Sequence, residues 1–259
     1  PKSHQENLDI TYRMNQEICD FPSRMWYQGK LRPASVNSDS RLRLNSTALA
    51  CNPGLPPDSI HTDSIRQFIT SVLDPEKPVV MILVDHEGCS QQCDMEAELM
   101  SSLAHQLVAC YGLKPEQIAL ISPHRAQNNA ITKRLGEMMA ESKAFGMPIV
   151  DRVQSCDQIL LAGSSNMPIV DTVERVQGAE RDVIIFGITS SDPDHVMSEF
   201  LNSPNRLNVA ITRARHKLII VGSQAFFFAI PDNEEMLEKN RCFKALLEHC
   251  REKDALFVV

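Results

Sequence analysis

A basic segment in the C-terminal part of this chain has the residue types of an anion-binding site. Residues 201–217 read LNSPNRLNVAITRARHK and carry Arg206, Arg213, Arg215 and Lys217, with no acidic side chain among them. The whole chain has a formal net charge of −7, so this segment is a local island of positive charge. Basic side chains bind phosphate oxygens well, and phosphate is the ligand that we expect here. A solvated edge of a charged helix is the alternative interpretation.

The same segment carries the signals of a helix that begins at Pro204. Ser203 offers a hydroxyl N-cap, and proline at the first helical position favours the helical backbone. The spacing predicts a helix from residue 204 to about residue 215. Its buried stripe would be formed by Leu207, Ala210, Ile211 and Ala214. Arg206 and Arg213 are seven residues apart, so this helix would hold both arginines on one side.

Strands and helices are expected to alternate along the chain. The expected strands are 79–84, 118–121, 169–173, 182–189 and 217–222. The expected helices, besides the arginine helix, are 94–111, 124–144 and 234–251. This alternation predicts an α/β fold, with a mostly parallel sheet and helices on both of its faces.

Two stretches interrupt the alternation. Residues 31–60 are rich in Pro, Ser and Asn and predict a long surface excursion, and residues 145–168 predict an insertion in one crossover. Apart from these two stretches, the pattern over residues 1–259 predicts a single domain. A hydrophobic content of 43% is enough for a substantial core.

Polar clusters follow several of the expected strands. Residues 122–125 follow the strand 118–121, and residues 172–181 follow the strand that begins at 169. Ligands of open α/β sheets bind beyond the carboxyl ends of the strands. We therefore expect these two clusters to converge with Arg213 at one edge of the sheet.

Four sequence blocks in order resemble the second RecA-like motor domain of superfamily 1 helicases. The closest branch, superfamily 1B, contains the nonsense-mediated-decay RNA helicase and the Dna-two-type nuclease-helicases. The blocks are LDITYRM (8–14), similar to the Tyr-Arg motif, ISPHRAQ (121–127), similar to motif IV, DTVERVQGAERDVII (171–185), similar to motif V, and LNVAITRAR (207–215), similar to motif VI. The resemblance covers nearly the whole chain and implies a RecA-like fold, of the P-loop NTPase type, that lacks its own P-loop.

The resemblance implies roles for three residues at a nucleotide. Tyr12 would stack on or beside the adenine, and Arg13 would reach the γ-phosphate. Arg213 would be the arginine finger, which neutralises the charge that develops on the transferred phosphoryl group.

Three residues of motif V would complete this site by the same resemblance. Glu180 would bind the ribose or position the nucleotide. Gln177 and Gly178 would sense the γ-phosphate and couple it to the nucleic acid, and Gln177 counts with the two arginines as a catalytic candidate.

Five further residues would contact the nucleic-acid backbone if the resemblance holds. They are Ser122, Pro123, His124, Arg125 and Thr172. The single strand would be travelled in the 5′-to-3′ direction. DNA and RNA both occur as substrates in this branch, so either remains open.

The phosphate loop G-x-x-x-x-G-K-[ST] does not occur in the sequence. In the family this loop, and the acidic pair that holds Mg²⁺, lie on the first RecA-like domain, which precedes this one. We therefore expect ATP and Mg²⁺ to be held mainly by that missing domain, which would be the partner of this chain. Alone, the chain is expected neither to hydrolyse ATP nor to unwind nucleic acid.

Two other classes of protein remain as alternatives. One is a degenerate helicase whose second domain only binds nucleic acid or protein. The other is an unrelated flavodoxin-like or Rossmann-like enzyme, which the missing G-x-G-x-x-G pattern disfavours.

The remaining composition indicates an intracellular protein, cytoplasmic or nuclear. No apolar run approaches the roughly 20 residues of a membrane span, and the first residues do not resemble a secretory signal. The eight cysteines are expected to be reduced thiols. His86, Cys89 and Cys93 lack the paired C-x-x-C spacing of a structural zinc site, so we expect core or loop cysteines and no metal.

Overall fold

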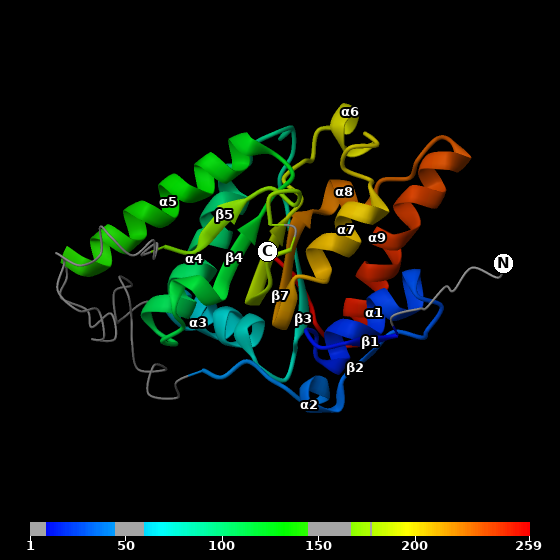
Figure 1. The fold of residues 1–259 in the computed structure, drawn as a ribbon. Helices are drawn as coiled ribbons and strands as arrows, with labels where there is room; N and C mark the ends of the chain where they lie inside the picture. Colours follow the sequence, from blue (N-terminus) through cyan, green and yellow to red (C-terminus); the bar gives the residue numbers. More distant parts are fainter. Residues whose placement is uncertain (1–8, 45–59, 145–166, 177) are drawn as a thin grey trace.

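A six-stranded parallel sheet organises the chain. The computed structural model describes residues 9–44, 60–144, 167–176 and 178–259. The strands lie in the order β5-β4-β6-β7-β3-β8, and every neighbouring pair is parallel (Figure 1). Their bounds are β3 (Val79–Val84), β4 (Ile118–Ile121), β5 (Ile169–Asp171), β6 (Arg181–Gly187), β7 (Ala214–Ser223) and β8 (Leu256–Val258). Two short strands, β1 (Ile10–Thr11) and β2 (Arg32–Pro33), pair separately.

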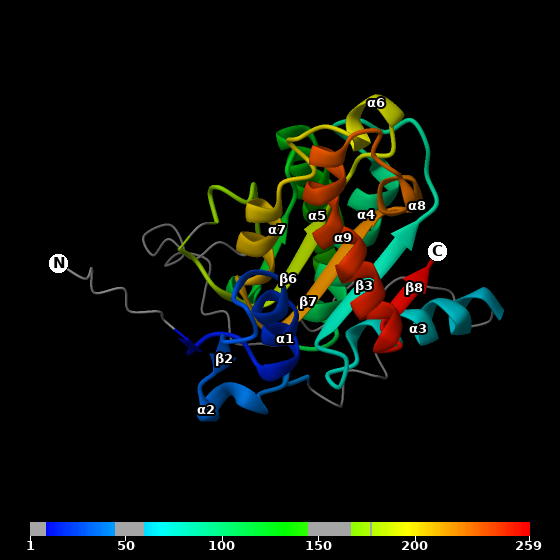
Figure 2. The same ribbon diagram turned by 90° about the vertical axis from the view of Figure 1, so that its right-hand side faces the viewer.

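Helices cover both faces of this sheet, which confirms the predicted α/β fold (Figures 1 and 2). One face carries α3 (Ile60–Leu73), α4 (Asp94–Ala109) and α5 (Arg125–Ala144). The other face carries α1 (Gln16–Trp26), α7 (Pro204–Ile211), α8 (Gln224–Phe228) and α9 (Glu234–Glu252). Shorter helical turns are α2 (Ser35–Ser38), η2 (Pro115–Gln117) and α6 (Pro193–Val196). No helix of the described ranges is both long and apolar enough to cross a membrane.

Strand β3 shows how the sequence produces the two layers. All six of its side chains are buried, and they alternate between the two hydrophobic cores. Met81 and Leu83 belong to the core beneath α1, α7 and α9, whereas Val80 and Ile82 belong to the core beneath α4 and α5. Successive strand residues point to opposite faces, so only an uninterrupted apolar run satisfies a sheet covered on both sides.

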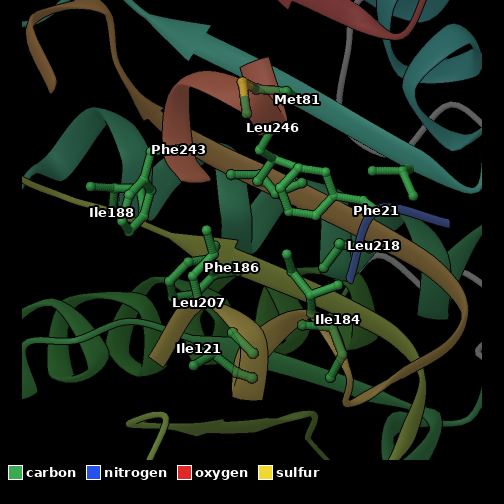
Figure 3. Close-up of a cluster of buried hydrophobic side chains, with 14 of the residues drawn as sticks. Phe21, Met81, Ile121, Ile184, Phe186, Ile188, Leu207, Leu218, Phe243 and Leu246 are labelled. Carbon is green, nitrogen blue, oxygen red and sulfur yellow. The ribbon is translucent and has the colours of Figure 1, made fainter. Parts of the chain in front are cut away.

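The core beneath α7 and α9 fixes the elements that carry the basic segment. Figure 3 shows Phe186 and Leu218 of the sheet beside Leu207 of α7 and Phe243 of α9. Each of these side chains is at most 4% exposed. Close packing of this kind holds α7, and the residues that follow it, in one position against the strands.

The arginine helix is shorter than its periodicity predicts. Helix α7 ends at Ile211, and β7 begins at Ala214, which pairs with Arg181 of β6. Arg213 lies in the turn between helix and strand, so the expectation that Arg206 and Arg213 share one helix face is wrong. Ala214 is buried as predicted, but its burial comes from the sheet rather than from a helical stripe.

The two predicted interruptions are only partly visible. Within 31–60 the structure places β2 and α2, and Leu42 is buried in the core. Residues 45–59 and most of the predicted insertion, 145–166, lie outside the described residues.

Gly222 of β7 is the position at which a single methyl group should disturb this fold. A Cβ there would lie 2.9 Å from Phe227 Cε2 and 3.1 Å from Ile188 Cβ. We expect Gly222→Ala to lower the free energy of unfolding by about 1–3 kcal/mol, because the packed core has no room to move. Gly136→Ala, within helix α5, is the matched control, since among the described residues its Cβ would meet only Met167 Cε, at 3.9 Å. That change should raise the free energy of unfolding, by at most about 1 kcal/mol. Urea unfolding measures both, and equal effects would contradict the packing argument.

Candidate functional site

A cluster of three arginines around one carboxylate lies at the amino edge of the sheet. Arg13 follows β1, Glu180 directly precedes β6, and Arg213 and Arg215 lie at the start of β7. The pairing of Arg181 with Ala214 sets the first residues of β6 and β7 side by side. The backbone N–H of Arg181 donates to the carbonyl oxygen of Arg213 over 3.1 Å, which fixes this junction.

Glu180 binds two of the three arginines. Its Oε2 accepts from Nε of Arg13 at 2.6 Å, and its Oε1 accepts from Nε of Arg215 at 3.0 Å. Arg13 also donates to the carbonyl oxygen of Thr212 over 2.7 Å. The hydrogen bonds from Arg13 and Arg215 lower the pKa of Glu180, so this carboxylate stays ionised.

Arg213 differs from its neighbours because it forms no ion pair with any described carboxylate. Its Nε donates to the carbonyl oxygen of Val209 at 3.1 Å, and one of its terminal nitrogens lies 3.5 Å from the carbonyl oxygen of Ala179. Carbonyl oxygens orient the guanidinium without neutralising it. Burial, together with the positive charge of Arg13, lowers the pKa of Arg213, so the cation is held in an unfavourable place. An anion supplied from outside would relieve this cost.

Tyr12 and Gly178 complete the exposed side of this cluster. The Tyr12 side chain precedes Arg13 and is 77% exposed, which leaves its ring free to meet a ligand. Gly178 has a φ of +87°, in the left-handed region that favours glycine, and no atom of the described residues lies within 4 Å of where its Cβ would be. Gln177 lies outside the described residues.

A second polar cluster lies at the opposite, carboxyl edge of the sheet. Ser122 is fully buried, and its hydroxyl lies 3.0 Å from that of Thr189 in the loop after β6. Thr172, at the end of β5, is also buried. The Ser122–Thr189 pair joins the loops after β4 and β6, whereas Arg125, at the start of α5, is exposed.

His124 begins a stack of flat groups at this carboxyl edge. Its ring lies 5.3 Å from that of Phe200, and the guanidinium of Arg206 lies 4.0 Å from the Phe200 ring centroid. Glu174 holds Arg206 through an ion pair of 2.7 Å. Burial lowers the pKa of His124, and the charges of His195 and Arg206 lower it further, so its ring is mainly neutral at pH 7. Pro123 lies half-buried beside this stack.

The two clusters do not converge, and the expectation that they share one edge of the sheet is wrong. Residues 122–125 and 172 follow strands, whereas Glu180 and Arg213 precede strands. All six strands are parallel, so strand starts and strand ends lie at opposite edges. The segment 172–180 runs from one edge back to the other, and its two halves belong to different clusters.

Comparison with known proteins decides the family. The family model described as "AAA domain" matches residues 2–225, which is most of the chain. The chain belongs to this family.

Individual relatives of this AAA domain include both kinds of helicase in the branch that the four blocks indicate. It is 28% identical to the DNA replication ATP-dependent helicase/nuclease DNA2 of Gallus gallus, over 89% of this chain and 18% of the relative. The Homo sapiens protein of the same name is 27% identical over 95% of this chain and 21% of its own length. The Regulator of nonsense transcripts 1 homolog of Drosophila melanogaster is 25% identical over 96% and 17%. The resemblance to the second RecA-like domain of superfamily 1B is thus confirmed, although the chain spans only about a fifth of these relatives' length.

One part of this AAA domain was missed by the sequence patterns. Phe200 is 40% exposed and carries Arg206 on its ring, but nothing in its local sequence marks it. The one sequence signal for this part of the site is Arg206, which the sequence pattern indicates only as a member of the basic segment. Two of the three arginines of that segment therefore lie at different edges of the sheet, Arg213 at the amino edge and Arg206 at the carboxyl edge.

Proposed function

We propose that this chain is the second motor domain of an ATP-dependent helicase that moves along single-stranded nucleic acid. The observation that carries the proposal is Arg213, beside Arg13 and the exposed ring of Tyr12. The guanidinium of Arg213 is held by a backbone carbonyl and has no carboxylate partner in the described part of the chain. Relatives named as ATP-dependent helicases support the same function. By that likeness the protein would work inside the cell, in the cytoplasm or nucleus.

The amino-edge cluster fits the polyphosphate end of ATP. A planar guanidinium donates two parallel hydrogen bonds to phosphate oxygens, and Arg213 already has its orientation set by backbone carbonyls. Arg13 would act on the γ-phosphate beside it, while Tyr12 would stack on the adenine and Glu180 would reach the ribose. Gln177 and Gly178 would relay the state of the γ-phosphate toward the nucleic acid.

The same cluster does not fit Mg²⁺. Its carboxylates are already paired with cations, Glu180 with Arg13 and Arg215, and Asp182 with Arg215. Mg²⁺ prefers free oxygen ligands. We therefore assign Mg²⁺, and the cradle for the phosphates, to the first RecA-like domain of the same protein. Closure of the two domains would bring Arg213 to the phosphates, which links hydrolysis to movement.

The carboxyl edge would form part of the nucleic-acid path. Arg125 is exposed there and is placed to meet phosphates, and the stack of His124, Phe200 and Arg206 is placed to meet bases. Ser122 and Thr172 are buried, so we assign them the positioning of these loops, with Pro123 fixing the turn. Travel would be 5′-to-3′ on DNA or RNA.

Phe200→Ala tests the path separately from ATP. Removing the middle member of the stack should weaken single-strand binding by about 1–3 kcal/mol, roughly 5- to 150-fold in Kd, as for other stacked bases. Phe228→Ala is the control, because Phe228 of α8 is 51% exposed and takes part in no ring stack among the described residues. Fluorescence anisotropy with labelled single strands measures the change. Equal losses in both variants would contradict a role for the stack.

The experiment that tests the whole proposal is ATP hydrolysis by the full-length protein. The rate would be measured with single-stranded DNA, with single-stranded RNA and without nucleic acid. Stimulation by one of them is expected, and the better activator identifies the substrate. The 259-residue chain alone should show no turnover, because it lacks the phosphate loop. A full-length protein that binds strands without hydrolysing ATP would instead favour the non-catalytic binding module.

A further inference from the structure

Three potential metal ligands meet where β3 leaves the sheet, away from the arginine cluster. His86 and Cys89 lie in the loop after β3, and Cys93 is the N-cap of α4. A ring nitrogen of His86 and the sulfur atoms of both cysteines all lie within 4.8 Å of one another. His86 and Cys93 are buried, and Cys89 is half-buried, so an ion placed among them would be largely shielded from water.

His86 has the carboxylate partner that a metal-binding histidine usually has. Its Nε2 lies 3.0 Å from Oε1 of Glu96, and its Nδ1 lies 2.9 Å from the Ser191 hydroxyl. Glu96 is itself completely buried, and its other oxygen accepts the backbone N–H of Thr189 at 2.9 Å. Metal-binding histidines usually donate their second N–H to a carboxylate in this way, which leaves a lone pair on the first nitrogen. In this geometry the lone pair is on Nδ1, where it accepts the hydroxyl of Ser191 at 2.9 Å, so a metal ion would have to replace that hydrogen bond.

The two cysteines are held by their backbone, so only their side chains need to rotate. Gln127 of α5 accepts from the N–H of Cys93 at 2.8 Å and donates to its carbonyl oxygen at 3.1 Å. The carbonyl oxygen of Cys89 accepts from the backbone N–H of Ser191 at 2.7 Å. The backbone N–H of Cys89 donates to the hydroxyl of Ser191 at 3.0 Å. The framework of the site is therefore in place.

We propose that His86, Cys89 and Cys93 bind a Zn²⁺ ion. One nitrogen and two sulfur ligands suit zinc, whose bonds to sulfur of about 2.3 Å place two sulfurs on a tetrahedral ion roughly 3.8 Å apart. That spacing is within the present separation. Both thiols lose their protons to solvent when the zinc–sulfur bonds form. A water molecule completes the fourth position.

Such an ion would join two loops of the carboxyl edge. One is the β3–α4 loop, and the other is the loop after β6, in which Thr189 holds Ser122 and Ser191 holds Cys89. The sequence spacing disfavours zinc because no paired C-x-x-C is present. The fold supplies instead what the spacing lacks, a buried carboxylate behind the histidine.

Zinc content of the 259-residue chain tests the proposal. The protein is purified without chelator under reducing conditions, and bound zinc is measured for wild type, Cys89→Ser and Cys242→Ser. We expect wild type and Cys242→Ser to retain zinc, because Cys242 is a buried cysteine of α9 outside the site, and Cys89→Ser to lose it. Glu96→Gln should weaken zinc affinity about 10–100-fold, as carboxylates behind metal-binding histidines do. Co²⁺ in place of zinc should give a thiolate charge-transfer band that Cys89→Ser lacks.

Three results would overturn the zinc site. The first is wild-type protein that neither retains nor takes up zinc, and the second is a Cys89→Ser variant that keeps zinc fully. The third is a Cys89–Cys93 disulfide that persists under the reducing conditions, detected by mass spectrometry, which would make the cluster a redox pair. None of these results depends on ATP hydrolysis, so the zinc site and the proposed motor function stand or fall separately.

Discussion

Arg213→Ala is expected to abolish most of the nucleic-acid-stimulated ATP hydrolysis of the full-length protein. Loss of an arginine finger typically reduces the rate by about 10³–10⁵-fold, because charge on the transferred phosphoryl group is no longer neutralised. Arg213 has the features that this role needs. It has no carboxylate partner among the described residues, and two carbonyl oxygens hold it in place. The measurement is kcat with saturating single-stranded nucleic acid.

Two further variants separate this effect from a loss of fold. Arg134→Ala removes a half-buried arginine of α5 that is paired with Glu98 and Glu137, and it should leave kcat unchanged. Arg213→Lys keeps the charge but loses the planar fork, so we expect most of the defect to remain. Thermal unfolding of each variant checks the fold. Full activity in a folded Arg213→Ala protein would remove the central element of the proposal.

Strands buried on both faces could be predicted from the sequence with their correct bounds. The apolar runs 79–84 and 118–121 coincide with β3 and β4, because a strand covered on both sides tolerates no polar position. Strand β8 was not predicted, since three residues at the end of the chain give too short a pattern. Helix α3 was also missed, because its start lies within a stretch that reads as an irregular excursion.

The position of Arg213 could not be predicted from periodicity. Leu207, Ala210, Ile211 and Ala214 satisfy a helical stripe, yet the pairing of Ala214 with Arg181 converts the last turn into strand. This is a contact between residues 33 positions apart, and a local pattern contains no information about it. The same applies to the opposite edges of the sheet, because sequence order does not reveal where the connection from 172 to 180 crosses the sheet.

The resemblance to the helicase motifs nevertheless indicated the members of the arginine cluster. Arg13, Glu180 and Arg213 were assigned to one site by resemblance, and the structure brings these three together. The carboxyl-edge residues also lie together, but burial separates Ser122 and Thr172 from exposed Arg125. Side-chain exposure depends on loop packing, which motif order does not encode.

The second large effect is expected at Arg13, and Arg215 provides its control. Both arginines bind the carboxylate of Glu180, so each alanine variant leaves that carboxylate with one remaining partner. Of the two, only Arg13 lies next to exposed Tyr12, and only its positive charge lowers the pKa of Arg213. We expect Arg13→Ala to lower kcat by roughly 10²-fold or more, the usual cost of removing a donor that stabilises transition-state charge. Arg215→Ala should lower kcat less than about 10-fold, because Arg215 braces Glu180 and Asp182 rather than the phosphate.

The comparison of these two variants distinguishes chemistry from support. If Arg13 only held Glu180, the two variants would lose similar activity, and Glu180→Gln would reproduce both losses. If Arg13 leaves Glu180 to reach the γ-phosphate when the domains close, Arg215 alone must then hold the carboxylate, and Glu180→Gln should affect KM for ATP more than kcat. The double variant Arg13→Ala/Arg213→Ala should lose less kcat than the product of the two single-variant losses, since both cations would act on the same developing charge. Losses that simply multiply in the double variant would place the two arginines on separate steps.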